Sequence, residues 1–135
     1  MRNNNAQSSI ILFTGCGFFF LWVDILFGHV TAGLKHPAMW FPVVFVPFAA
    51  AASFVAGLRP SSGVLKIFQI LCWAAVALGM MGFCFHLSRL LVDFNRGDPN
   101  WSAFVRLMRY PPVLAPLSIS GLGVLGLLGI SRRMS

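Results

Sequence analysis

Four long apolar segments, separated by short polar ones, constrain this chain more than any other feature. They cover residues 10–30, 39–58, 64–91 and 113–130. A helix needs about 20 mostly apolar residues to cross the hydrocarbon core of a bilayer. A helix also satisfies its own backbone hydrogen bonds where no water is present. The sequence therefore predicts an all-α fold, an integral membrane bundle of four transmembrane helices that forms a single domain over residues 1–135.

The composition agrees with this prediction and narrows the function. Hydrophobic residues make up 58% of the chain, charged residues 10%, and the mean hydropathy is +0.82, outside the range of soluble domains. The chain has no nucleophile elbow, phosphate loop or zinc-protease helix, so we expect a non-catalytic protein. The net charge of +7 comes from basic residues near the segment ends, where they bind lipid headgroups. We therefore expect the lipid bilayer as a partner and no nucleic acid.

The basic residues divide evenly between the two sides of the predicted membrane, so the positive-inside rule does not choose an orientation. The terminal side carries Arg2, Arg59, Lys66, Arg132 and Arg133, and the opposite side carries Lys35, Arg89, Arg96, Arg106 and Arg109. The free amino terminus and the longer third loop, residues 93–108, favour cytoplasmic termini. We expect the protein in a bacterial inner membrane.

Small residues recur every three or four positions in three of the apolar segments. The three stripes are Ala49, Ser53 and Gly57; Ala75, Gly79, Gly82 and His86; and Ser120, Gly123, Gly126 and Gly129. Small side chains let membrane helices approach closely, so each stripe predicts a helix contact. Because His86 shares the second stripe, we expect its side chain to point into the bundle.

All three histidines, His29, His36 and His86, fall at the same predicted membrane face. Imidazole is a common ligand of metals and haem, and Arg89, one turn beyond His86, would suit an anionic group such as a haem propionate. These four residues are the candidate cofactor site, with haem b as the candidate cofactor and the three histidines as candidate metal ligands. The alternative is that the histidines are half-hydrated interfacial side chains, with His36 stabilising the turn before Pro37.

Asp24 is the only acid inside an apolar segment. A carboxylate at such a position must find a partner or take up a proton. A hydrogen bond to a neighbouring helix is the plainer interpretation, and passage of a proton or cation is the alternative.

Prolines gather on the histidine side. They are Pro37, Pro42 and Pro47 around the second segment and Pro111, Pro112 and Pro116 at the fourth, with Trp40, Trp101 and Tyr110 as interfacial aromatic residues. A proline within a helix removes one hydrogen bond and frees a carbonyl. We expect protein or a polar cavity to satisfy such a carbonyl. The alternative for Pro111 and Pro112 is that they only mark the start of a helix.

Two local resemblances extend these observations. The run HVTAGLKH, residues 29–36, resembles the motif His-x-x-x-Gly-Ile/Leu-Arg/Lys-His of the cytochrome b subunit of succinate dehydrogenase, which implies that His29 is an axial haem ligand. The stretches HPAMWFP, GFCFH and YPPVLAP, at residues 36–42, 82–86 and 110–116, resemble an uncharacterised family of small four-helix bacterial membrane proteins. That family implies a fold and no activity.

The function that these observations favour is a non-catalytic accessory subunit of a larger membrane complex of the electron-transfer type. Its partners would be other membrane subunits or further copies of the chain. The first alternative is a redox protein that binds haem b or a metal through His29, His36 and His86. The second is a small proton-coupled transporter that works through Asp24, which would need to dimerise to enclose a path.

Overall fold

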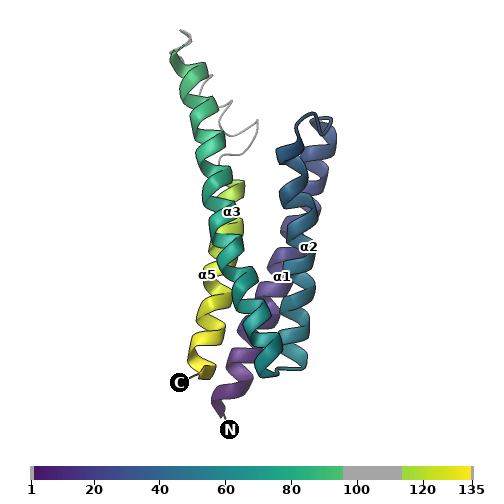
Figure 1. The fold of residues 1–135 in the computed structure, drawn as a ribbon, viewed down its shortest axis with the longest axis vertical. Coiled ribbons are helices and arrows are strands. Elements are labelled where there is room, and N and C mark those ends of the chain that lie inside the picture. Colours follow the sequence, from purple (N-terminus) through teal and green to yellow (C-terminus); the bar gives the residue numbers. More distant parts are fainter. Residues whose placement is uncertain (1, 96–113, 135) are drawn as a thin grey trace.

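The computed structural model describes residues 2–95 and 114–134, and this part of the chain is helical with no strand. Its elements are α1 (Arg2–Thr31), the 3-10 turn η1 (Pro37–Met39), α2 (Trp40–Leu58), α3 (Ser62–Asn95) and α5 (Ala115–Met134) (Figure 1). The first three predicted segments lie within this helical chain. The fourth begins at residue 113, outside the described residues, and continues on α5. The all-α prediction is confirmed for the described residues.

Among the described residues, three helical stretches are long and apolar enough to cross a membrane: Asn5–Thr31, Pro37–Leu58 and Ser62–Ser88. The apolar part of α5, Ala115–Ser131, is shorter. At 1.5 Å per residue it extends about 26 Å, slightly less than the hydrocarbon core of a typical bilayer. By length and composition, the helices suggest a membrane protein.

The four α-helices of the described residues pack side by side as a ring. Contacts are most extensive between α3 and α5 and between α1 and α2, intermediate between α1 and α5, and least between α2 and α3. Both chain termini lie at one end, which we call the terminal end (Figure 1). At the other end, where α1 finishes and α2 begins, the α1–α2 pair diverges from α3 (Figure 1). We call this the histidine end, because it carries His29 and His36.

The turn after α1 is a Schellman motif, which reverses the chain at the histidine end. Leu34 N donates to His29 O at 3.0 Å, and Gly33 N donates to Val30 O at 2.9 Å, the pair of bonds that defines this motif. Gly33 has a φ of 82°, a left-handed conformation that glycine adopts without steric cost. Leu34 follows with a φ of 47°. The motif satisfies the last carbonyls of α1 and directs the chain toward α2.

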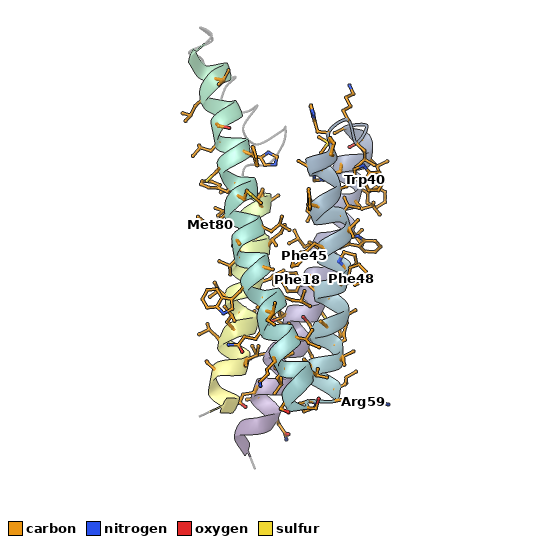
Figure 2. The ribbon with its side chains drawn as sticks, in the orientation of Figure 1. Phe18, Trp40, Phe45, Phe48, Arg59 and Met80 are labelled. Carbon is orange, nitrogen blue, oxygen red and sulfur yellow. The ribbon has the colours of Figure 1, made fainter. Side chains whose placement is uncertain are left out.

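The buried apolar residues form two clusters along the bundle. One lies toward the terminal end and contains Ile11, Ala56, Phe68, Cys72 and Ile130. The other lies further along and contains Phe18, Ile25, Val43, Val46, Ala49, Ala50, Ala75 and Ile119. Phe45 packs against the second cluster and points from α2 toward α3, whereas Trp40 and Phe48 point away from the bundle (Figure 2).

The small-residue stripes lie at helix contacts, as their spacing predicts. A Cβ added at Gly79 would lie 2.5 Å from Pro116 O and 2.7 Å from Ser120 N, and one added at Gly123 would lie 2.7 Å from Cys72 O. Contacts this close to backbone atoms leave no room for a side chain. One member departs from its stripe: Gly129 faces Ile11 of α1 at 3.0 Å rather than α3.

Candidate functional site

His29 lies in the last turn of α1 and is half-buried. Its Nδ1 is 2.8 Å from the carbonyl oxygen of Ile25, one turn earlier. A carbonyl oxygen only accepts hydrogen bonds, so Nδ1 carries the proton and donates it. In the neutral ring, the lone pair then belongs to Nε2. Histidines that bind metals are commonly oriented by this type of second bond, so His29 offers Nε2 as a ligand or proton acceptor.

His36 is exposed and shapes the backbone of the loop. Its φ of −119° and ψ of 136° are extended, as expected for a residue before proline. Its carbonyl oxygen accepts a hydrogen bond from Met39 N at 3.0 Å, and its side chain makes no capping bond to η1. The backbone of His36, rather than its imidazole, stabilises this turn.

His86 is half-buried on α3, one turn beyond Gly82. A Cβ at Gly82 would lie 3.0 Å from the Cβ of Pro116, so this stripe of α3 faces the start of α5. The side chain of Arg89 lies outside the described residues. So does the segment 96–113, which contains Trp101, Tyr110, Pro111, Pro112 and the basic residues Arg96, Arg106 and Arg109.

The structure does not assemble the three histidines into a metal site. Over residues 2–95 and 114–134, no group of three or more His, Cys, Asp or Glu side chains is placed to hold a metal ion. The α1–α2 pair, which leads to His29 and His36, diverges from the part of α3 that carries His86 (Figure 1). Binding of haem b, which needs at most two histidines, stays a prediction.

Asp24 is exposed on α1. It makes no hydrogen bond or ion pair with any residue that the structure describes, so the expected bond to a neighbouring helix is not formed there. It lies seven residues before Thr31, the last residue of α1, or about 10 Å along the axis. Phe20 and Phe27, on the same side of the helix, are 71% and 68% exposed. The carboxylate therefore faces outward among aromatic side chains, and passage of a proton or cation through Asp24 stays a prediction.

An interhelical hydrogen bond from Trp22 was not predicted from the sequence. Pro47 lies inside α2 and has no N–H, so the carbonyl of Val43, four residues earlier, lacks its usual helical donor. Trp22 Nε1 of α1 donates to that oxygen at 2.9 Å. The general expectation that protein would satisfy a freed carbonyl is thus met at Pro47. The position of Pro47 in the sequence identifies Val43 as the residue whose carbonyl is freed. The identity of the donor, however, depends on how α1 is rotated about its axis.

A second interhelical bond joins α5 to α3. Ser120 Oγ donates to Val76 O at 2.9 Å, beside the close approach at Gly79. By contrast, the buried hydroxyl of Ser53 donates to Ala49 O of its own helix at 2.8 Å. Both hydroxyls thus bond to backbone carbonyls within the bundle.

No family model, curated protein or solved structure matches this chain. The resemblances to the succinate dehydrogenase subunit and to the four-helix bacterial family therefore stay predictions. The function is therefore inferred from the contacts of the described residues.

Proposed function

We propose that this chain is an integral membrane protein whose four helices all cross the bilayer, and that it is a non-catalytic accessory subunit of a larger membrane complex. The presence of both termini at one end supports an even number of crossings (Figure 1). The shorter apolar part of α5 can be accommodated by local thinning of the bilayer or by flanking polar residues that reach the interface.

The observation that carries this proposal is the outward position of Asp24. Lipid offers no partner to a carboxylate within the hydrocarbon region, and such residues usually pair with protein groups. The side chains of Trp22, Ser53 and Ser120 bond to carbonyl oxygens of the described bundle. Asp24 makes no hydrogen bond or ion pair with a described residue, so we take it to be available to a neighbouring protein.

We place the complex among electron-transfer assemblies of a bacterial inner membrane, with the termini of this chain in the cytoplasm. The resemblance of residues 29–36 to a respiratory cytochrome subunit supports the assignment to an electron-transfer assembly. The length of the sequence between the third and fourth apolar segments, residues 93–108, supports the orientation.

Native isolation tests the accessory role. The tagged full chain is extracted from its own membranes in a mild detergent, separated by native electrophoresis, and analysed by mass spectrometry. We expect wild type to migrate with larger membrane subunits in fixed stoichiometry, and Asp24→Leu to migrate mainly alone. Ser118→Leu is the matched control, because Ser118 is an exposed polar residue of α5. If wild type also runs alone, and cross-linking in intact membranes yields no larger species, the accessory role is wrong.

A second candidate function, haem b binding, is favoured by one observation. The bond from His29 Nδ1 to Ile25 O leaves Nε2 as the atom that would bind a haem iron. A bound haem would supply one-electron chemistry at the histidine end. The test is a visible spectrum of the purified protein, oxidised and reduced, together with metal analysis. A b-type band that His29→Ala abolishes and His36→Ala retains would support this candidate, and a colourless, metal-free protein would exclude it.

A further inference from the structure

We propose that the outer face of α1 around Asp24 binds a transmembrane helix of another subunit that carries a lysine or arginine at the same depth. The two side chains would form an ion pair inside the membrane. The inference rests on the proposed function, since it names the surface and the chemistry by which the accessory subunit is attached.

The face has the spacing of a helix contact. Phe13, Phe20 and Phe27 recur every seven residues and are 68%, 71% and 68% exposed. A seven-residue repeat is typical of helices that pair at small crossing angles. Asp24 lies one turn after Phe20 and one turn before Phe27, so its carboxylate lies on the face that such a neighbouring helix would cover.

Gly28 extends this face and makes no close contact with another described helix. A Cβ added at Gly28 would meet nothing within 4 Å, whereas one added at Gly15 would lie 3.0 Å from the Cβ of Ser53 and one added at Gly17 would lie 2.5 Å from a methyl group of Leu122. Gly15 and Gly17 therefore serve contacts within the bundle. Gly28, one turn after Asp24, leaves backbone accessible where a partner helix could approach closely.

Charge complementarity favours a basic partner over a second copy of this chain. A second copy would place another carboxylate against Asp24, and like charges at short distance oppose ionisation of both. Residues 5–31 and 37–58 contain no Lys or Arg, and Lys66 lies in the first turns of α3, at the terminal end. His29 lies about 140° around the helix from Asp24. Residues 67–88 and 114–131 contain no Lys or Arg either, so no described apolar helix of a second copy brings a lysine or arginine to this depth.

A pair of opposite charges is also the arrangement that lipid tolerates best. A single charge in the hydrocarbon region is costly, while a contacting pair is neutral overall and its attraction is strong at low dielectric. An exposed Asp24 thus supplies one half of such a pair. The cation also gives specificity, because a helix without it would leave the carboxylate unpaired.

The test uses a synthetic probe helix in phosphatidylcholine vesicles. The probe is a single leucine-rich span with one lysine at the depth of Asp24, and its association with the full chain is measured by energy transfer between fluorescent labels. Matched probes carry leucine or glutamate instead of the lysine. We expect the lysine probe to bind wild type about tenfold more tightly than the leucine probe.

Variants of the chain locate the effect. Asp24→Asn should abolish the preference for the lysine probe, and Asp24→Lys should prefer the glutamate probe. Gly28→Leu should weaken lysine-probe binding, while Ser118→Leu should not. The double variant Asp24→Leu, Ile70→Asp moves the carboxylate from α1 to α3, and it should not restore binding of the lysine probe to the α1 face. Adding Gly28→Leu to this double variant should therefore leave lysine-probe binding unchanged. Circular dichroism confirms that each variant is folded.

Two results would overturn the inference: equal binding of the lysine and leucine probes, or Asp24-dependent association of the chain with itself that the lysine probe does not displace. The outcome is separable from that of the accessory role. If the probe fails but native isolation yields the larger complex, the accessory role stands and the surface is wrong. If the probe binds but the native chain runs alone, the surface stands and the accessory role is wrong.

Discussion

The terminal half and the histidine half of the molecule are packed differently. Toward the termini, all four helices bury residues and glycines bring backbones into contact, as at Gly123 against Cys72 O. Toward the histidines, α1 and α2 still bury residues as far as Ile25 and Val43, whereas the buried positions of α3 end at Gly79 in the described part of the chain. The closely packed half holds the helices together. We call the histidine half the open half, because the described part of α3 diverges there from α1 and α2 (Figure 1). It carries the candidate residues His29, His36 and His86.

The largest expected effect is at Gly79, in the closely packed half, and Gly28 in the open half is its comparison. In Gly79→Ala, the new Cβ would lie 2.5 Å from Pro116 O and 2.7 Å from Ser120 N, and backbone atoms cannot turn aside as a flexible side chain can. We expect α3 and α5 to move apart, with a loss of about 3 kcal/mol in the free energy of unfolding. Circular dichroism during denaturation by SDS in mixed micelles measures the loss.

Gly28→Ala is the matched substitution on the open side. Its Cβ would meet no described atom within 4 Å, so only the higher helix propensity of alanine acts. We expect an unchanged or slightly more stable protein, by at most about 1 kcal/mol. Equal losses at Gly28 and Gly79 would contradict the contrast between the two environments.

The next effect concerns the hydrogen bond near the boundary between the two halves. Trp22→Phe removes the donor of Val43 O, which Pro47 deprives of its backbone donor. We expect a loss of about 2 kcal/mol. In a Pro47→Ala background, the residue at 47 regains its N–H and can donate to Val43 O, so the cost of Trp22→Phe should fall by about half. A double-mutant cycle measures this coupling, and an equal cost in both backgrounds would show that the bond does not replace the one lost at Pro47.

The sequence predicts the packed half better than the open half, for physical reasons. Apolar length alone locates the helices, and small residues such as Gly79 and Gly123 mark the contacts, because close approach excludes larger side chains. The direction of Asp24 depends instead on the rotation of α1, which its partners α2 and α5 set together. Convergence of His29, His36 and His86 depends in addition on the separation of the helices at their open end, which no local pattern encodes.

A smaller effect is expected for the second interhelical bond. Ser120 Oγ donates to Val76 O, but that oxygen also lies within reach of the backbone N–H of Met80 in the regular helix α3. Loss of the Ser120 hydroxyl therefore leaves Val76 O with its backbone hydrogen bond. We expect Ser120→Ala to lower the free energy of unfolding by about 0.6 kcal/mol. Ser118→Ala, at an exposed position of the same helix, should cost nothing measurable. The same SDS titration checks both, and a Ser120→Ala cost equal to that of Trp22→Phe would show that the two carbonyls are equally dependent on their side-chain donors.

The smallest effect on the isolated chain is expected at Asp24. Asp24→Asn should leave the free energy of unfolding unchanged, because the carboxylate contacts no described residue through a hydrogen bond or ion pair. The SDS titration measures this in the purified protein, with Trp22→Phe on the same helix as the positive control. A loss as large as that of Trp22→Phe would mean that Asp24 serves the fold and would remove the reason to assign it to a partner. If Asp24→Asn leaves the stability of the isolated chain unchanged but abolishes the native complex, Asp24 acts in binding and not in folding. That result would also explain why a polar group that contributes nothing to this bundle is placed on its apolar surface.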